Sequence, residues 1–288
     1  MPVRAAVFAY HDVGVRCLGV LLAAGVEVPL VVTHRDDPRE RIWFASVAEL
    51  AARHGIETLT PEDPDTPELM ARLRALAPDF LFSFYYRRML SPELLAVAGR
   101  GAFNLHGSLL PRYRGRAPVN WAVLRGETET GATLHEMVAK PDAGRILDQE
   151  PVPIGPEDLA VEVFRRVTEA AETVLRRSLP GLLAGSAAFR AQDLSKGSYF
   201  GGRKPEDGRI DWRRSAAEIH NLVRAVAPPF PGAFTEIGGA RLMIHRTRRE
   251  PGRTAPQAVS GPFREGDAWF AACGDGTVLR LLEVELEP

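Results

Sequence analysis

Cysteine is scarce in this sequence: Cys17 and Cys273 are the two in 288 residues, and they stand near opposite ends. Two isolated thiols form neither a disulfide framework nor the spaced ligand pairs of a zinc module, so no metal site is expected. The sequence also lacks the run of about 18 apolar residues that a membrane helix needs. Its start lacks the basic, apolar and small-residue order of a signal peptide. These absences predict a protein of the reducing cytoplasm without a membrane span.

An excess of charge of one sign is missing as well. The formal net charge is -1, with 25% charged and 45% hydrophobic residues, which is an ordinary globular balance. A protein whose main partner is a polyanion usually carries a basic surplus, so nucleic acid is not expected as a partner. A chain of 288 residues can bury one large core or, more commonly, fold as two domains.

The N-terminal part alternates between strand-like and helix-like segments, which is typical of a parallel sheet covered on both faces. Short apolar runs predict strands at residues 5–10, 26–33 and 79–86. Helical spacing predicts helices at residues 15–24, 46–54, 67–76 and 91–98. The fold class expected is therefore α/β, with a Rossmann-like, mostly parallel sheet. The first turn reads AYHDVGVRCLG and lacks G-x-G-x-x-G, which argues against an NAD-dependent dehydrogenase.

The composition changes near Gly185, where a long amphipathic helix beginning near Leu159 comes to an end. We expect a catalytic domain at residues 1–190, a polar, glycine-rich linker at 191–210 and a second domain at 211–288. Ser215 and Glu218 form a capping-box pair that predicts a helix at the start of this second domain. Short β-type runs follow, separated by Gly238-Gly239, Gly261-Pro262 and Gly274-Asp275-Gly276, which predicts a small C-terminal β-barrel-like (OB-like) domain.

The run FNLHGSLLPRYRGRAP places two polar side chains on one face of a predicted strand. Phe103 and Leu105 alternate with Asn104 and His106, and the strand then enters a proline-bounded loop. Asp142 follows in a Pro-Asp-Ala-Gly turn, after about the length of a helix and a returning strand, so its carboxylate can come back beside the imidazole. The ends of parallel strands are where open α/β sheets build their sites.

Asn104, His106 and Asp142 together suit acyl transfer to an external amine. An Asn amide can donate a hydrogen bond to an oxyanion, and a His beside a carboxylate can stay protonated and act as a general acid. The same residues also suit a plainer role, in which an Asn and a His at a strand end anchor the following loop through hydrogen bonds. The residues by themselves leave both interpretations open.

Other polar residues near the predicted strand ends also have two interpretations. His11 and Asp12 can contact a ligand or simply begin the first helix. Arg114 and its neighbours Arg112 and Arg116 can be solvated, or can pair with phosphate or carboxylate groups of a substrate. A further cluster in one loop, which consists of His34, Asp36 and Asp37, lacks the one-face spacing of a zinc site and is expected to be a solvated loop.

The run FNLHGSLLPRYRGRAP with the later DAG resembles the signature of the formyltransferases that use 10-formyltetrahydrofolate. The resemblance covers nearly the whole chain. The methionyl-tRNA branch of that family typically carries a basic insertion after the second strand, whereas this sequence reads THRDDPRERIWFASV. The stretches AYHDVG, FSFYYRRML, RGRAPVNW and FGGRKPEDGRIDW are instead similar to the branch that formylates UDP-4-amino-4-deoxy-L-arabinose in lipid A modification. That branch is commonly fused to a decarboxylase, and an activity of that kind is not expected in this chain.

The resemblance implies roles for particular residues. Asn104, His106 and Asp142 would be the catalytic set, and no metal would be required. The residues implied to border the folate are Arg88, Met89, Leu90, Arg116, Val138, Ala139, Lys140 and Pro141. Those implied to contact the nucleotide-linked sugar are His11, Arg114 and Arg203. A homodimer, the identity of the sugar and its nucleotide, and the presence of a separate decarboxylase partner stay open.

In the implied mechanism, the sugar amine attacks the formyl carbon of the cofactor, and the oxyanion takes hydrogen bonds from Asn104 and protonated His106. His106 then passes a proton to the departing folate nitrogen, and Asp142 favours the protonated imidazole by its opposite charge. Alternatives within the family are methionyl-tRNA or another nucleotide-linked amino sugar as acceptor. Water as the acceptor would make a formyltetrahydrofolate hydrolase, and loss of catalysis would leave a binding module.

Overall fold

The computed structural model describes residues 2–38, 40–256 and 260–287, and the chain divides into two compact units. The first unit comprises Met1–Gly115, Gly131–Val152 and Arg166–Tyr199. The second comprises Arg116–Thr130, Pro153–Arg165 and Phe200–Pro288. The domain boundaries expected at residues 190 and 210 stay a prediction.

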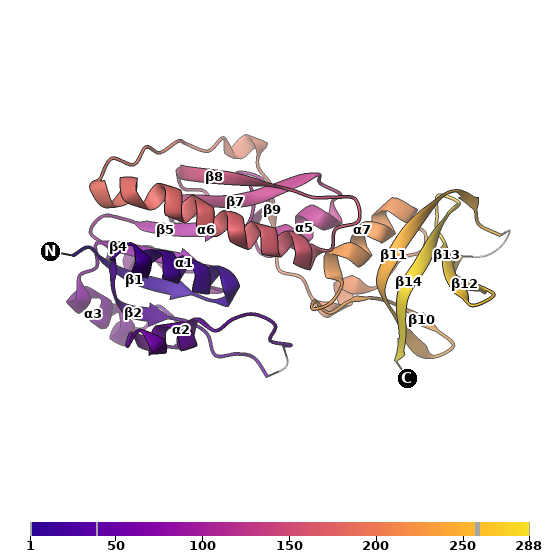
Figure 1. Cartoon of the computed structure of the whole chain (residues 1–288), viewed down its shortest axis with the longest axis horizontal. Coiled ribbons are helices and arrows are strands. Elements are labelled where there is room, and N and C mark those ends of the chain that lie inside the picture. The colour runs from indigo at the N-terminus through magenta and orange to yellow at the C-terminus, as the bar shows by residue number, and fades with distance from the viewer. Residues whose placement is uncertain (1, 39, 257–259, 288) are drawn as a thin grey trace. The chain divides into compact units, whose positions relative to one another are not determined.

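A seven-stranded sheet with the order β3-β2-β1-β4-β5-β7-β8 organises the N-terminal part of the chain (Figure 1). Its strands are β1 (Arg4–Ala9), β2 (Glu27–Val32), β3 (Glu57–Leu59), β4 (Phe80–Phe84), β5 (Ala102–His106), β7 (Glu129–Glu136) and β8 (Ile146–Pro153). Strands β1 to β5 pair in parallel, and β7 pairs antiparallel with β5. The predicted α/β class with a mostly parallel sheet is therefore confirmed.

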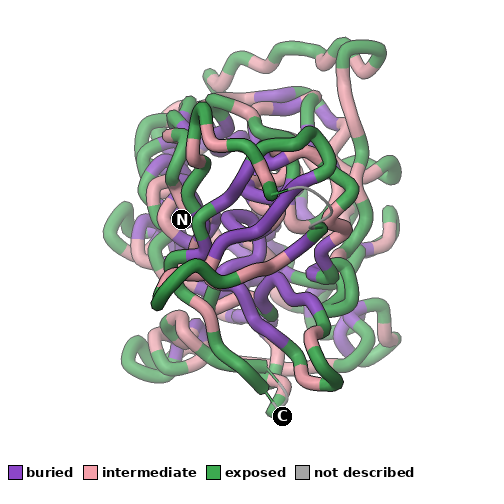
Figure 2. Tube along the Cα trace, turned by 90° about the vertical axis from the view of Figure 1, so that its right-hand side faces the viewer, coloured by how far each residue is buried: buried purple, intermediate pink, exposed green. Residues whose placement is uncertain are grey.

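Strands β1 and β4 lie in the middle of the sheet because their sequences are apolar at nearly every position. All five residues of β4 are buried. Phe80 and Phe82 pack with Phe103 of β5 at ring separations of 6.0 Å, and Phe84 stacks on Phe82 at 5.6 Å. These aromatic side chains therefore form core, as their sequence predicts. Figure 2 colours the chain by burial and shows buried segments inside the fold and exposed turns at its outside.

Helices cover both faces of this sheet. The helices of the first unit are α1 (His11–Ala23), α2 (Val47–Arg53), α3 (Pro67–Leu76), α4 (Pro92–Leu95) and most of α6 (Ala160–Ala184), whereas α5 (Pro118–Leu124) belongs to the second unit. Leu69 and Leu73 of α3 join the buried cluster that contains Phe8 of β1. Gly14 of α1 lies against the other face, because a Cβ at that position would come within 3.1 Å of the Cβ of Ala9. Within the described residues, no helix has both the length and the apolar character needed to cross a bilayer.

Several elements differ from the prediction: α1 begins at His11 rather than at residue 15, and β3 was not predicted. Helix α4 ends at Leu95 rather than at residue 98, because the chain must turn through Gly101, at φ 121°, to enter β5. Strand β8 was not predicted, since its sequence ILDQEPVP is polar and contains two prolines. Its carboxylates are neutralised by α6 instead, where Arg177 binds both Asp148 and Glu150. Such a strand is tolerated at the sheet edge, where a missing N–H is not needed.

The second unit combines helix α7 (Ala216–Val226) with a five-stranded antiparallel sheet. The sheet has the order β10-β11-β14-β13-β12, with strands Ala233–Ile237, Ala240–Thr254, Thr277–Glu287, Ala268–Ala272 and Gly261–Glu265 in that order. The predicted capping box is present. The side chain of Ser215 accepts a hydrogen bond from the backbone N–H of Glu218, and the side chain of Glu218 accepts one from the backbone N–H of Ser215. The prediction of a small all-antiparallel C-terminal β domain is confirmed.

The segment expected as a linker contains short regular elements. These are η1 (Leu194–Lys196), β9 (Tyr199–Phe200) and η2 (Pro205–Gly208). Strand β9 pairs with β6 (Arg114–Gly115), in the loop that follows β5. Composition alone misses this pairing because the partner lies far away in the sequence.

Candidate active site

Strand β5 presents Asn104 and His106 together, on the face opposite to its core residues. Phe103 and Leu105 are 2% and 1% exposed and anchor the strand in the core. Asn104 pairs across the sheet with His135 of β7, and His106 is the last residue of the strand. The two side chains predicted to act together therefore lie at the carboxyl end of a central strand, where α/β sheets build their sites.

His106 is held between two oxygen acceptors. Its Nε2 lies 2.8 Å from the carbonyl oxygen of Tyr113, and its Nδ1 lies 3.6 Å from Oδ1 of Asp142. A carbonyl and an ionised carboxylate only accept hydrogen bonds, so this setting favours a ring with N–H on both nitrogens. The 3.6 Å approach is an ion pair rather than a hydrogen bond. The Nδ1 proton is therefore the one available to a third atom.

Asp142 sits in a turn that the fold specifies closely. Its backbone has a positive φ of 52°, and Oδ2 accepts from the N–H of Gly115 at 2.8 Å. Gln192 donates to the carbonyls of Asp142 and Gly144 at 3.0 and 2.6 Å. Gly144 has no room for a Cβ, which would lie 2.0 Å from the carbonyl oxygen of Glu136. Turn and carboxylate are thus fixed from several directions.

The charge of Asp142 is favoured by its partners. Burial acts to raise the pKa of this carboxyl, but the nearby His106 ring, which is the largest opposing influence, and the N–H of Gly115 outweigh that effect and hold the pKa well below its usual range. Its side chain is 13% exposed. The carboxyl of Asp142 is therefore ionised at neutral pH.

His135 is a member of the site that the sequence analysis missed. It is 1% exposed, and its Nε2 lies 3.5 Å from Oδ1 of Asp142 and 3.2 Å from Nδ2 of Asn104. The two imidazoles stand edge to face with ring centroids 6.5 Å apart. The alternation of β7 predicts which face of the strand carries His135. Its position opposite Asn104 depends on the register of the β5–β7 pairing, which the sequence does not show.

The loop after β5 is locked by side-chain hydrogen bonds to its backbone. Ser108 donates to the carbonyl of Arg112 at 2.6 Å, and Thr133 donates to the carbonyl of Ser108 at 2.6 Å. The N–H of Tyr113 donates to the hydroxyl of Ser198 at 2.8 Å. These bonds fix the Tyr113 carbonyl that orients His106.

The residues implied to border the folate lie in two segments of the first unit, apart from Arg116, which belongs to the second unit. Arg88, Met89 and Leu90 follow the end of β4, whereas Val138 to Pro141 follow β7, which runs antiparallel and ends beside the start of β5. Met89 and Val138 are 59% and 43% exposed, whereas Leu90 is buried in the core. Two exposed apolar side chains beside the strand are available to a ligand.

The residues implied to contact the sugar nucleotide are separated. His11 begins α1 and stacks on Phe44 at 3.9 Å, and burial, with Arg87 second, lowers its pKa to about 3. Arg203 lies in the second unit, with its guanidinium 4.9 Å from the ring of Trp121. Arg114 lies in the first unit, directly before Gly115, and is 8% exposed. Of the three, Arg114 belongs to the same loop as the groups around Asp142.

The loop after β2 is less solvated than predicted. His34 stacks on Tyr86 at 4.2 Å, and its Nε2 accepts from the N–H of Arg87. Burial, together with Arg87 and Arg88, lowers the pKa of His34 to about 4. A hollow of about 300 Å³ beside it is lined by Tyr10 and Phe44, among others. The hollow lies at the carboxyl ends of β1 and β2, on the sheet edge that also carries His106.

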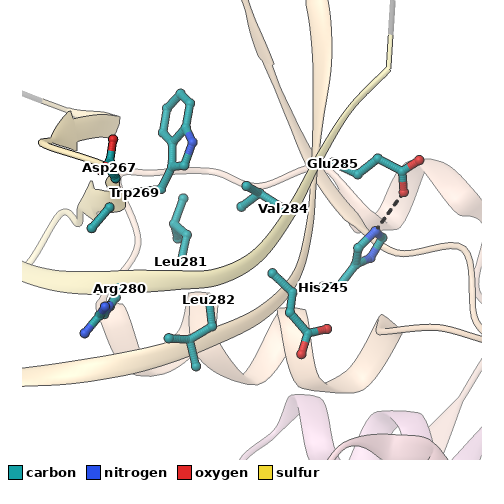
Figure 3. A pocket seen from close by; sticks show the side chains of 10 residues that line it. His245, Asp267, Trp269, Arg280, Leu281, Leu282, Val284 and Glu285 are labelled. Atoms are coloured by element: carbon teal, nitrogen blue, oxygen red, sulfur yellow. Dashed lines mark ion pairs between the residues drawn. The ribbon is translucent and has the colours of Figure 1, made fainter.

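A larger hollow, of about 780 Å³, lies within the second unit (Figure 3). It is lined mainly by β13 and β14, and His245 lies 3.5 Å from a carboxylate oxygen of Glu285 there. Exposed Leu282 is beside them. None of the Asn, His and Asp residues described above lines it, so its size does not make it the reaction site.

The Asn104, His106 and Asp142 arrangement can stabilise an oxyanion and deliver a proton. Asn104 supplies amide N–H groups, and His106 supplies an acidic N–H beside a fixed carboxylate. Neither residue is positioned as a nucleophile activated by a base, because His106 faces hydrogen-bond acceptors on both sides. The geometry therefore suits transfer of an acyl group between two external molecules.

Residues 21–179 match the family model described as formyl transferase, and residues 203–288 match that of the formyl transferase C-terminal domain. Three solved structures illustrate the similarity. An N-formyltransferase from Helicobacter canadensis, in complex with folinic acid and dTDP-3-aminofucose, is 19% identical, with a TM-score of 0.74 over 97% of this chain and 98% of its own. WlaRD, a sugar 3N-formyltransferase with dTDP and 5-N-formyl-THF, is 19% identical, with a TM-score of 0.77 over 97% of each chain.

The third structure is a sugar N-formyltransferase from Shewanella sp., 18% identical, with a TM-score of 0.68 over 84% of this chain and 96% of its own. At these identities the likeness establishes a shared fold, and the first two matches cover nearly the whole chain. The two family-model matches together span most of the chain.

We expect Asn104→Ala and His106→Ala each to lower the turnover rate on the order of a hundredfold or more, the cost of removing one oxyanion donor. Folate affinity should change little, because neither side chain is needed to bury the ligand. Single-turnover rates and equilibrium folate titration measure the two quantities separately. Near wild-type turnover in either variant would exclude that residue from the chemistry.

Replacing Asp142 by Asn should move the pH dependence of the single-turnover rate. The pKa of Asp142 lies far below neutral pH, so titration of this carboxyl does not shape the pH–rate curve near neutrality. Without its charge the protonated His106 ring is less favoured and loses its proton earlier as pH rises. The pH above which the rate falls should therefore be lower in the variant. An unchanged descending limb in a variant that still binds folate would identify Asp142 as a loop anchor.

Proposed function

Because the chain belongs to the formyl transferase family, we propose that it moves a formyl group from 10-formyltetrahydrofolate to the amine of a nucleotide-linked amino sugar. The observation that carries this proposal is the arrangement of Asn104, His106 and Asp142 at the end of β5. It offers oxyanion donors and an acid without a nucleophile of its own.

The proposed reaction has a single acyl transfer. The amine nitrogen attacks the formyl carbon and forms the new C–N bond, and the carbonyl oxygen becomes an oxyanion that takes hydrogen bonds from Asn104 and from Nδ1–H of His106. The bond between the formyl carbon and the folate nitrogen then breaks. His106 gives its proton to that nitrogen and then takes up the proton that the amine nitrogen releases, so that the imidazole is protonated again when the reaction ends. Asp142 stays ionised throughout and keeps the imidazole oriented.

Folate as the donor is supported by the two segments that follow β4 and β7. Met89 and Val138 expose apolar side chains there, which suits a flat heteroaromatic ring, and Arg88 and Lys140 supply cations for a carboxylated tail. The similar N-formyltransferase from Helicobacter canadensis is in complex with folinic acid, and the similar protein WlaRD was solved in the presence of 5-N-formyl-THF. No step of the reaction asks the protein for a metal.

An anionic acceptor is supported by Arg114. Its guanidinium is largely withdrawn from solvent, and in the described part of the chain its buried Nε has no hydrogen-bond partner. A buried N–H that lacks an acceptor is costly. A diphosphate in the acceptor would provide the missing acceptor oxygens, beside the loop that holds Gly115 and Asp142.

Among nucleotide sugars we propose UDP-4-amino-4-deoxy-L-arabinose, which would place the chain in lipid A modification and polymyxin resistance. The stretches AYHDVG, FSFYYRRML and FGGRKPEDGRIDW support this choice. The acidic loop THRDDPRERIWFASV argues against the methionyl-tRNA branch.

A panel of acceptors tests the proposal: UDP- and TDP-linked amino sugars, charged tRNA, and no acceptor at all. We expect formyl product with UDP-4-amino-4-deoxy-L-arabinose. We also expect little of the steep salt dependence that follows when many phosphates are neutralised. Tight tRNA binding that weakens strongly with salt would establish the tRNA branch. Folate turnover without any amine would establish a hydrolase.

Arg114→Met should raise the KM for the nucleotide sugar by tenfold or more, the order expected when a charge-assisted bond to phosphate is lost. The KM for folate should stay within about twofold. Arg176→Met is a matched control, because Arg176 is an exposed arginine that pairs with Glu172 on α6. A raised KM for folate with an unchanged acceptor KM would assign Arg114 to the cofactor instead.

A further inference from the structure

His135 faces three polar partners, and their chemistry determines which of its nitrogens carries a proton. Its Nδ1 lies 2.7 Å from the carbonyl oxygen of Glu136, which can only accept a hydrogen bond. Nδ1 must therefore carry hydrogen. In the neutral ring, the lone pair is then on Nε2, which points at Asn104 and Asp142.

Asn104 fits this neutral tautomer and conflicts with the protonated ring. Its Nδ2 lies 3.2 Å from Nε2 of His135, and an amide nitrogen donates but does not accept. With His135 neutral, one N–H of Asn104 is bonded to the imidazole, and the described residues leave the second one unengaged. With His135 protonated, two N–H groups would meet. The amide would have to turn and offer its oxygen to the ring.

The charges around His135 favour its neutral form when His106 is protonated. Among the described residues, the titratable groups in contact with His135 are Asp142 at 3.5 Å and His106 at a ring separation of 6.5 Å. The side chain of the adjacent Glu136 is neutralised by Arg145. One carboxylate faces two imidazoles, and His106 has an oxygen against each nitrogen, so His106 is the ring suited to the charge. A second cation beside it would be repelled.

We propose that His135 is a positioning residue: as the neutral Nδ1–H tautomer it accepts a hydrogen bond from Asn104 and so holds that amide with an N–H toward the reacting formyl oxygen. Protonation of His135 at low pH turns the amide and removes this donor. The site thus contains two histidines with opposite requirements, since His106 works protonated and His135 works neutral. The catalytic consequence rests on the proposed formyl transfer, whereas the tautomer and the amide orientation do not.

Two substitutions separate positioning from simple packing. His135→Gln places a side-chain oxygen near Asn104 and does not titrate, so it should keep the single-turnover rate within about tenfold of wild type. It should also extend activity to lower pH. His135→Phe keeps the ring shape without an acceptor and should lower the rate by tenfold or more, up to the roughly hundredfold cost of losing an oxyanion donor. His54→Gln, at an exposed histidine, is the matched control and should change nothing.

A double-mutant cycle tests whether His135 acts through Asn104. If it does, adding His135→Phe to Asn104→Ala should lower the rate no further, because the amide that it positions is already gone. Protonation of the acceptor amine affects every variant equally and cancels in the comparison. Additive losses, or an acid limb that is unchanged in His135→Gln, would show that His135 only fills space.

Nitrogen-15 NMR of the histidine rings provides a readout that needs no turnover. With His135→Gln used to assign the signal, wild-type protein at neutral pH should show His135 as the neutral Nδ1–H tautomer. The Asn104 side-chain amide signals should shift as His135 titrates. An Nε2–H tautomer or a doubly protonated His135 at neutral pH would overturn the proposal, even in a protein inactive with every acceptor tested. If these signals are as expected but no acceptor is formylated, the proposed function fails, whereas the tautomer of His135 and its hold on the Asn104 amide stand.

Discussion

The site depends on one buried negative charge. Asp142 lies 3.6 and 3.5 Å from the facing nitrogens of His106 and His135, and its side chain is 13% exposed. In such surroundings a charge without partners is unfavourable, and removing one partner of a buried pair typically costs about 3–5 kcal/mol. The ionised carboxylate therefore requires a cation beside it, and the protein supplies a histidine whose proton is chemically useful.

The backbone around Asp142 explains how the charge stays in place. Gly115 donates to the carboxylate, Gln192 holds the carbonyls on either side of the turn, and Gly144 allows the turn to pass close to β7. These contacts come from three separate segments of the first unit. Because its folded-state pKa is depressed, Asp142 contributes stability above the pKa of an unfolded aspartate, and this contribution is lost as pH falls. The interaction that prepares the site for chemistry also stabilises the fold.

The two histidines show how one carboxylate can serve two functions. Each ring has one nitrogen on a backbone carbonyl, Tyr113 for His106 and Glu136 for His135, which fixes the ring orientation. The remaining nitrogens differ in their partners, because only His135 also faces an amide N–H donor. Similar side chains thereby acquire different protonation preferences from the groups around them. The roles that we propose for the two histidines depend on this difference.

The sequence by itself determined the α/β class, the polar face of β5 and the approach of Asp142 to His106. Those features follow from local patterns: apolar runs, the alternation of Asn104 and His106, and a turn at Pro141. Strand β8 and the pairing of β6 with β9 were missed because polar residues and distant partners leave no periodic signal. Tertiary structure alone decided the role open to His135, since a strand's alternation gives its face but not its register with a neighbour. Tertiary structure also decided that Arg114, in the loop that follows β5, is buried while Arg112 and Arg116 are exposed. Burial depends on what the rest of the chain packs over each side chain, which the sequence does not show.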